Sequence, residues 1–231
     1  MRRILLKLSG EALSGDKGKG FDEPTVIKVA KQVKTLLDEG CQIGIVIGGG
    51  NFWRGRTSEK IDRTKADQIG MLATVMNCLY VSEIFRTEGM ETGILTPFTI
   101  GAFTDLFSKD KAVEGLSSGK VMFFAGGIGH PYFSTDTATV LRAIEIAADE
   151  ILLAKSIDGV YDSDPAKNPD AKKYDTISID EVVAMGLGVV DGAAAILAKE
   201  NKMPMRVFHL GEENSIINAG RGGACGTVVT A

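Results

Sequence analysis

Lys7 is the residue whose type and position point most directly to chemistry. It interrupts the apolar run Ile4–Leu8, and Ser9 and Gly10 follow that run. A charge in such a run either lies at a sheet edge, where the side chain reaches water, or faces a ligand beyond the strand. A lysine ammonium is a point charge suited to phosphate oxygens, and it contributes most where negative charge develops during reaction. Lys7 is therefore a candidate phosphate-binding residue.

Loops rich in glycine or in small residues stand at the ends of three predicted strands, at Lys7–Gly10, Gly48–Arg54 and Gly126–Asp136. Glycines let backbone N–H groups approach phosphate oxygens, and a following helix adds the positive end of its dipole. Three such loops at one edge of a sheet predict an anion-binding site. Arg54 ends the second loop, and its guanidinium fork suits phosphate.

Three carboxylates stand near predicted helix starts: Asp67, Asp136 and Asp191. Each could cap its helix by accepting backbone N–H bonds. Alternatively, the Asp67 carboxylate could accept hydrogen bonds from two ribose hydroxyls. Asp136 and Asp191 could then serve the Mg²⁺ and the lysine orientation that phosphoryl transfer needs. The residues alone leave both interpretations open.

Short apolar runs alternate with helical patterns along the chain. Strands are predicted at Arg3–Leu8, Gln42–Ile47, Glu91–Leu95, Lys120–Ala125, Glu150–Ala154, Met205–His209 and Gly226–Thr230. Helices are predicted at Asp22–Glu39, Lys65–Arg86, Ser108–Leu116, Asp136–Ala148, from the capping box Ser178–Glu181, and at Asp191–Asn201. Apolar strands alternating with helices predict an α/β three-layer sandwich around a mostly parallel sheet. Such sheets bind ligands beyond the carboxyl ends of their strands, where the three loops would meet.

Composition excludes several classes of function. The 26 basic and 30 acidic residues give a net charge of −4, which offers no excess to neutralise a nucleic-acid backbone. No signal-peptide core and no apolar run of the ~18 residues needed to span a bilayer is found. The 3 cysteines and 2 histidines lack metal-ligand spacing. We therefore expect a cytoplasmic protein of one domain without a structural metal, its two lobes meeting near Ala148.

Standard phosphate motifs are absent. Neither G-x-x-x-x-G-K-[ST] nor a strand followed by G-x-G-x-x-G occurs. The acidic segment Asp158–Pro165 lacks the spacing of a calcium-binding EF-hand. A phosphate site here must therefore use another fold.

The joint set of motifs resembles the bacterial UMP kinases. The matching segments are Lys7–Glu11, Gly48–Asn51 with Arg54, Asp67–Thr74, Ser134–Ala138, Asp158–Tyr161 and Asp164–Pro165. Their order and spacing cover essentially the whole chain. UMP kinases belong to the amino acid kinase family, whose carbamate kinase-like fold needs no Walker motif.

The resemblance implies roles for individual residues. ATP would be held by Lys7, Leu8, Ser9, Gly10, Gly50, Arg54, Lys155, Tyr161 and Asp164. UMP would be held by Gly49, Asp67, Ile128, Gly129, His130, Pro131, Tyr132, Phe133, Ser134 and Thr135. The catalytic set would be Lys7, Arg54, Asp136 and Asp191, with Asp191 orienting Lys7. The implied reaction is ATP + UMP → ADP + UDP, with Mg²⁺ bound through ATP.

The resemblance further implies a homohexamer that GTP activates and UTP inhibits. The loop linked to GTP would comprise Gly15, Asp16, Lys17, Gly18, Lys19 and Gly20. Ile128 and His130 depart from the usual Thr-Gly-Asn, which removes a hydroxyl near the base and adds a titratable group. Two alternatives remain. One is a kinase of the same fold for an acetylated amino acid, carbamate or isopentenyl phosphate. The other is a sensor that binds UTP or GTP without turnover.

Overall fold

The computed structural model describes residues 1–53 and 60–231, and for Asp16 it describes the backbone alone. Among these residues, nine strands form one sheet in the order β4-β3-β5-β2-β1-β6-β10-β11-β9. They are β1 (Arg3–Leu8), β2 (Gln42–Ile47), β3 (Thr92–Thr96), β4 (Asp105–Leu106), β5 (Val121–Phe124), β6 (Glu150–Lys155), β9 (Thr176–Ser178), β10 (Met205–His209) and β11 (Thr227–Thr230). A separate hairpin pairs β7 (Val160–Tyr161) with β8 (Lys173–Tyr174).

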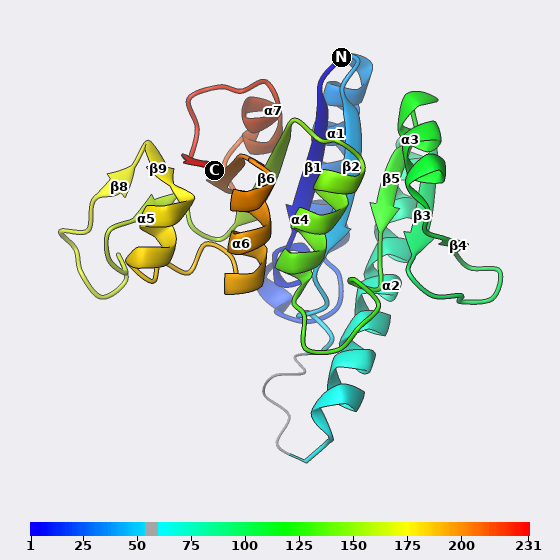
Figure 1. Cartoon of the computed structure of the whole chain (residues 1–231). Coiled ribbons are helices and arrows are strands. Elements are labelled where there is room, and N and C mark those ends of the chain that lie inside the picture. The colour runs from blue at the N-terminus through cyan, green and yellow to red at the C-terminus, as the bar shows by residue number, and fades with distance from the viewer. Residues whose placement is uncertain (54–59) are drawn as a thin grey trace.

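The sheet is mostly parallel, as the sequence predicts. Strands β5, β2, β1 and β6 are neighbours and run in the same direction. Their carboxyl ends therefore meet at one edge of the sheet, the lower edge in Figure 1. Strand β11 pairs with β10 in the antiparallel sense. Because β1 and β6 come from the two expected lobes and pair directly, one sheet runs through both. The lobe boundary near Ala148 stays a prediction.

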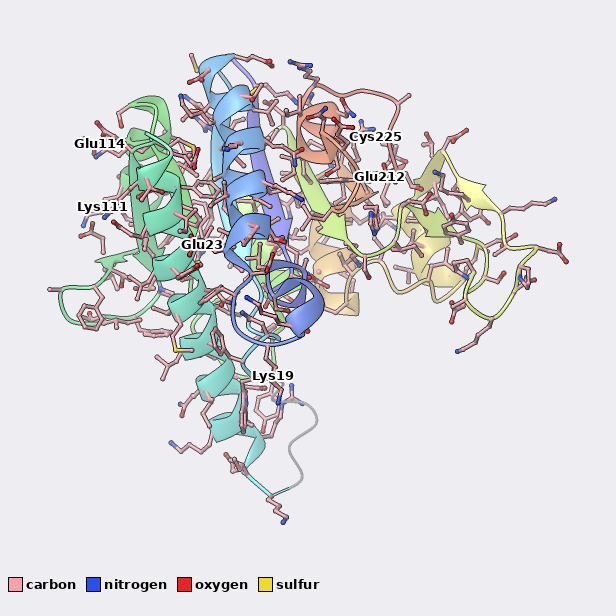
Figure 2. All side chains as sticks on the ribbon, turned by 180° about the vertical axis from the view of Figure 1, so that it is seen from behind. Lys19, Glu23, Lys111, Glu114, Glu212 and Cys225 are labelled. Atoms are coloured by element: carbon pink, nitrogen blue, oxygen red, sulfur yellow. The ribbon has the colours of Figure 1, made fainter. Side chains whose placement is uncertain are left out.

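Helices cover both faces of the sheet. One face carries α1 (Glu23–Asp38), α2 (Arg63–Thr87) and α7 (Ser215–Gly220). The other carries α3 (Lys109–Ser117), α4 (Thr135–Glu145), α5 (Ile179–Ala184) and α6 (Gly192–Glu200). Figure 1 shows α4 and α6 in front of the sheet, and Figure 2, seen from behind, shows α1 and α2. The three-layer prediction is confirmed.

Alternation along β1 decides where its lysine points. Ile4, Leu6 and Leu8 belong to the core under α1 and α2, whereas Leu5 belongs to the core under α4. Successive side chains of a strand point to opposite faces, so Lys7 shares the face of Leu5. The strand therefore directs Lys7 toward α4.

The elements that sequence reasoning missed are short. Strands β4, β7, β8 and β9 and helix α7 have two to six residues each. Segments of this length complete too little of a period to be recognised. The capping box at Ser178 and Glu181 is present as predicted, and it begins α5.

Helix α2 has two different faces. Val75 and Phe85 point into the core, whereas Ile69, Leu72 and Met76 are exposed and form an apolar stripe. Among the described residues, α2 is the one helix long and apolar enough to cross a membrane, with 44% of its apolar window buried. The sequence prediction considered uninterrupted apolar runs and so did not single out this helix. Its contacts with β2, β3 and β5 make α2 a core helix of the sandwich.

Candidate active site

The loops after β1 and β2 pack directly against each other at the carboxyl edge. A Cβ atom on Gly10 would lie 2.3 Å from Oδ1 of Asn51 and 2.6 Å from the carbonyl oxygen of Gly48. Only glycine allows this approach, because any side chain would overlap those oxygens. The expected convergence of the first two glycine loops is therefore found in the structure.

A pair of buried amides holds these loops to α2. Asn51 and Asn77 exchange hydrogen bonds of 3.0 and 2.8 Å between their side chains. Asn77 also donates to the carbonyl of Gly48 at 2.6 Å, and Asn51 donates to that of Gly20 at 2.9 Å. We call Asn51 and Asn77 the amide clamp. It joins the β2 loop, the loop that contains Gly20 and the middle of α2, and sequence reasoning did not identify it.

Lys7 forms an ion pair with Asp136 across the edge of the sheet. Its Nζ lies 3.0 Å from Oδ1 of Asp136, and the side chains are 12% and 21% exposed. Asp136 is available for this contact because Ser134 caps α4 by accepting from the backbone N–H groups of Asp136 and Thr137. The capping interpretation of Asp136 is therefore wrong, and this carboxylate faces the lysine.

Asp191 joins α6 to α4. It caps α6 by accepting from the backbone N–H of Ala194 at 2.9 Å, and it accepts from the hydroxyls of Thr137 (3.0 Å) and Ser134. Burial raises the pKa of Asp191, but these hydrogen bonds outweigh burial and leave the pKa below its usual value. We expected Asp191 to orient Lys7. In the structure, the carboxylate that pairs with Lys7 is that of Asp136.

A cavity of about 200 Å³ opens between α2 and the start of α4. Seven of the residues expected to hold UMP line it: Gly49, Asp67, Ile128, His130, Phe133, Ser134 and Thr135. Gly50, which the resemblance assigns to ATP, also lies in this wall. We call this space the α2–α4 cavity. Gly129, Pro131 and Tyr132 belong to the same loop without being among the described lining residues.

Asp67 does not cap α2. Asp62 does so by accepting from the backbone N–H of Lys65, and the helix begins at Arg63, two residues before the predicted start. Oδ2 of Asp67 instead accepts from Nε of Arg63 and from the backbone N–H of Tyr132, each at 2.8 Å. The structure thus removes the capping interpretation and places the carboxylate in the cavity wall.

A second cavity, of about 340 Å³, lies beyond the end of β6. It brings together Lys155, Tyr161 and Asp164, the three residues that the resemblance assigns to the adenine nucleotide. We call it the β6–β7 cavity. Tyr161 donates to Asp158 at 2.8 Å, and this hydrogen bond raises the pKa of Tyr161.

Lys155 ends β6, the strand that pairs with β1, which carries Lys7. Nζ of Lys155 donates to the carbonyls of Val189 and Gly188, the latter at 3.5 Å. Burial lowers the pKa of Lys155, while the nearby charge of Asp136 raises it and that of Lys7 lowers it. These mutual effects place Lys155 within electrostatic reach of the Lys7–Asp136 pair.

The loop assigned to GTP contains a short 3₁₀ helix at Gly15–Lys17. Gly20 bonds to Asn51 through its backbone N–H at 3.3 Å, so the loop contacts the amide clamp. Figure 2 shows Lys19 below the strands, on the side toward which the strands run in Figure 1. Arg54, expected to hold ATP phosphates, lies outside the described residues.

Sequence reasoning missed some residues that line the α2–α4 cavity, although a helical pattern could have indicated them. On α2, Asp67, Gly70, Met71 and Thr74 all line the α2–α4 cavity. They follow the spacing i, i+3, i+4, i+7 that marks one helix face. By contrast, Gly186–Val189 line the β6–β7 cavity from a turn with no recognisable motif.

No group of three or more His, Cys, Asp or Glu side chains in the described ranges is arranged to hold a metal ion. Asp136 and Asp191 nevertheless offer oxygen donors beside the loops, the kind that Mg²⁺ uses when phosphates supply most of its ligands. These two carboxylates fit an ion carried by a nucleotide.

Comparisons with known proteins identify the family and the fold. Residues 2–209 match the amino acid kinase family. The UMP kinase of Bacillus anthracis superposes with a TM-score of 0.95 at 36% identity, over 99% of this chain and 96% of that one. For the UMP kinase of Ureaplasma parvum, the TM-score is 0.94 at 31% identity, over 100% and 99% of the two chains. For the uridylate kinase of Archaeoglobus fulgidus, it is 0.73 at 25% identity, over 99% and 100%.

The fold, the glycine loops and the family match define the class, and the chain belongs to the amino acid kinase family. Its similarity to the two bacterial structures extends over nearly the full length of every chain compared. Within the family, it groups with the bacterial UMP kinases, which are nucleoside monophosphate kinases.

Proposed function

We propose that this enzyme transfers the γ-phosphoryl group of ATP to UMP. The observation that carries the proposal is the position of Lys7. Strand β1 lies between β2, whose loop lines the α2–α4 cavity, and β6, whose end lines the β6–β7 cavity. Lys7 and Asp136 are not among the described lining residues of either cavity, but β1 lies between the two strands whose ends are. At that edge a donor phosphate from one cavity could meet an acceptor phosphate from the other.

The chemistry asks little of the protein beyond alignment and neutralisation. An ionised phosphate oxygen of UMP attacks the γ-phosphorus of ATP, a new P–O bond forms, and the bond to the bridging oxygen of ADP breaks. Both reactants are anions, so positive charge and backbone N–H groups must offset their repulsion. Lys7 supplies that charge, held in place by Asp136 at 3.0 Å. No side chain needs to act as a general base.

Each cavity suits one substrate. The α2–α4 cavity combines glycines and the N-terminus of α4 for a phosphate with the Asp67 carboxylate for ribose hydroxyls. The β6–β7 cavity is larger and offers Tyr161 and apolar wall residues for an adenine ring. Mg²⁺ would enter with ATP, where it neutralises phosphate charge. Asp136 and Asp191 would be the carboxylates that contact it. Arg54 would add a second cation.

Regulation and assembly belong to the same proposal. Contact between Gly20 and the amide clamp supports a link from the predicted GTP loop to the β2 loop. The apolar stripe of α2 supports burial against other copies, in line with a homohexamer. Inhibition by UTP rests on the resemblance alone. We place the enzyme in pyrimidine nucleotide biosynthesis in the cytoplasm.

The test is ADP release with Mg·ATP against UMP, CMP, dUMP, AMP and no acceptor, each with and without GTP. We expect strong selectivity for UMP and a higher rate with GTP. Comparable turnover of CMP would instead identify Ile128 as a determinant that loosens base selection.

Absence of ADP release across the panel from a folded sample would contradict the proposal. Binding of UTP or GTP would then favour the sensor. Turnover of carbamate, an acetylated amino acid or isopentenyl phosphate would favour another acceptor.

A further inference from the structure

The loop Gly126–Ser134 has an unusual backbone. Gly126, Gly127 and Gly129 have φ values of +79°, +61° and +88°, which glycine adopts freely. Tyr132 has a φ of +72°, although it carries a large side chain. A non-glycine residue in this region is strained and persists only where its surroundings hold it. The contacts of Tyr132 therefore identify what fixes the loop.

Two residues of α2 hold Tyr132. Its backbone N–H donates to Oδ2 of Asp67 at 2.8 Å, and the same oxygen accepts from Nε of Arg63 at 2.8 Å. The guanidinium carbon of Arg63 also lies 5.3 Å from the centre of the Tyr132 ring, within range of a cation–π contact. Arg63 thus contacts both the carboxylate and the ring, and it closes a triangle between α2 and the loop.

The position of this triangle gives it a function. The first turns of α2 extend beyond the sheet edge, below the strands in Figure 1. Arg63 and Asp67 line the α2–α4 cavity from that helix, and His130 and Phe133 line it from the loop on either side of Tyr132. A contact that fixes the loop against α2 therefore fixes two walls of the cavity relative to each other.

We propose that Arg63 is a positioning residue for the acceptor nucleotide, acting through Asp67 and Tyr132. The inference rests on the proposed function, since it takes the α2–α4 cavity to be the UMP site. Arg63 holds the Asp67 carboxylate in the orientation that receives the ribose, and it keeps the strained loop closed over the cavity. The ATP site and the Lys7–Asp136 pair are made by other elements.

The variant Arg63→Met keeps the aliphatic stem and removes the Nε–H and the charge. Loss of a charge-assisted hydrogen bond at a partly exposed site predicts a KM for UMP raised about tenfold. We expect kcat and the KM for ATP to change by less than about twofold. Lys65→Met is the matched control, because Lys65 lies on the same turn, is exposed, and contacts Gln68 at 3.3 Å.

A second readout needs no substrate. The hydrogen bond from the Tyr132 N–H to Asp67 should slow hydrogen exchange at that amide. Arg63→Met should speed this exchange about tenfold, and Lys65→Met should leave it unchanged. Arg63→Lys retains charge without the planar fork and should give intermediate values in both assays.

The outcomes separate this inference from the proposed function. If the wild-type enzyme fails to phosphorylate UMP but Arg63→Met speeds exchange at Tyr132, the proposed function fails and the Arg63 contact stands. Unchanged exchange at Tyr132, or faster exchange with an unchanged KM for UMP in an active enzyme, would overturn the role of Arg63. A matching rise in the KM for ATP would overturn it too, since that result indicates general loosening. Should Arg63→Met fold poorly, the same comparisons apply to Arg63→Lys.

Discussion

Replacing Lys7 with methionine should separate stability from catalysis. The substitution keeps an apolar stem of similar length and removes the charge that faces Asp136 at 3.0 Å. It leaves a carboxylate that is 21% exposed without its ion-pair partner. The variant should therefore lose some unfolding free energy and most of its turnover, for two different reasons.

The size of each effect follows from the contact. At 3.0 Å and an effective dielectric constant of about 20, the direct attraction is roughly 5 kcal/mol. The cost of taking both charges out of water offsets most of it. Removing one partner of a charged hydrogen bond then costs about 1.5–3 kcal/mol of unfolding free energy. Removing a cation that stabilises developing charge lowers kcat by roughly 10²–10³-fold.

Lys7→Met, Asp136→Asn and the double variant together separate these effects. Urea denaturation gives the unfolding free energy, and steady-state ADP release gives kcat. In the double variant no charge is left unpaired, so the loss of stability should be smaller than the sum of the two single losses. Turnover should stay low, because the positive charge is still missing.

Three results would refute this reasoning. Near-normal turnover of a folded Lys7→Met enzyme would remove Lys7 from the catalytic machinery. Recovery of turnover together with stability in the double variant would show that Lys7 acts only by supporting the fold. A loss of unfolding free energy in the double variant equal to the sum of the two single losses would contradict the ion pair itself.

Three further predictions follow from other contacts. Asn77→Ala breaks the amide clamp and should raise the KM of both substrates in steady-state kinetics. Ser82 is also buried on the same helix, and Ser82→Ala should raise neither KM. Equal effects of the two variants would contradict the clamp. The pKa of Asp191 lies below 3.8 because its hydrogen bonds outweigh burial, so its stabilisation is present above about pH 4 and is lost as the pH falls through the native pKa. Between about pH 7 and pH 3, the unfolding free energy of Asp191→Asn should therefore fall less than that of the wild type. Equal falls for the two proteins, measured by urea denaturation at each pH, would contradict that sign. Leu72→Glu places a charge in the apolar stripe and should lower the oligomer mass measured by light scattering. Gln68→Glu changes an exposed polar position of the same helix and should leave that mass unchanged. An unchanged mass for Leu72→Glu would exclude the stripe as an interface.

Sequence reasoning predicts the fold well because the main elements are long and periodic. The run Gln42–Ile47 is a strand with the predicted bounds, and so is Met205–His209. Apolar alternation in β1 also explains why Lys7 faces α4. The short strands and α7 lie below the length at which a pattern becomes visible.

The details of the site depend on tertiary contacts that spacing does not encode. Asp62 and Asp67 are both plausible caps by residue type, and only the position where α2 begins decides between them. Lys7 had two acidic candidates, and the packing of α4 against β1 selects Asp136 while Asp191 binds hydroxyls of α4. Arg63 carries no motif. Its role emerges from a loop that is distant in sequence and adjacent in space.

The most direct test of phosphoryl transfer follows the phosphorus atom itself. ATP labelled at the γ-phosphate is incubated with Mg²⁺, UMP and the enzyme, and the products are separated and counted. Transfer between the two cavities predicts that the label appears in the β-phosphate of UDP, with one UDP formed for each ADP. Label released as inorganic phosphate, or retained in ATP by a folded and nucleotide-bound sample, would contradict it.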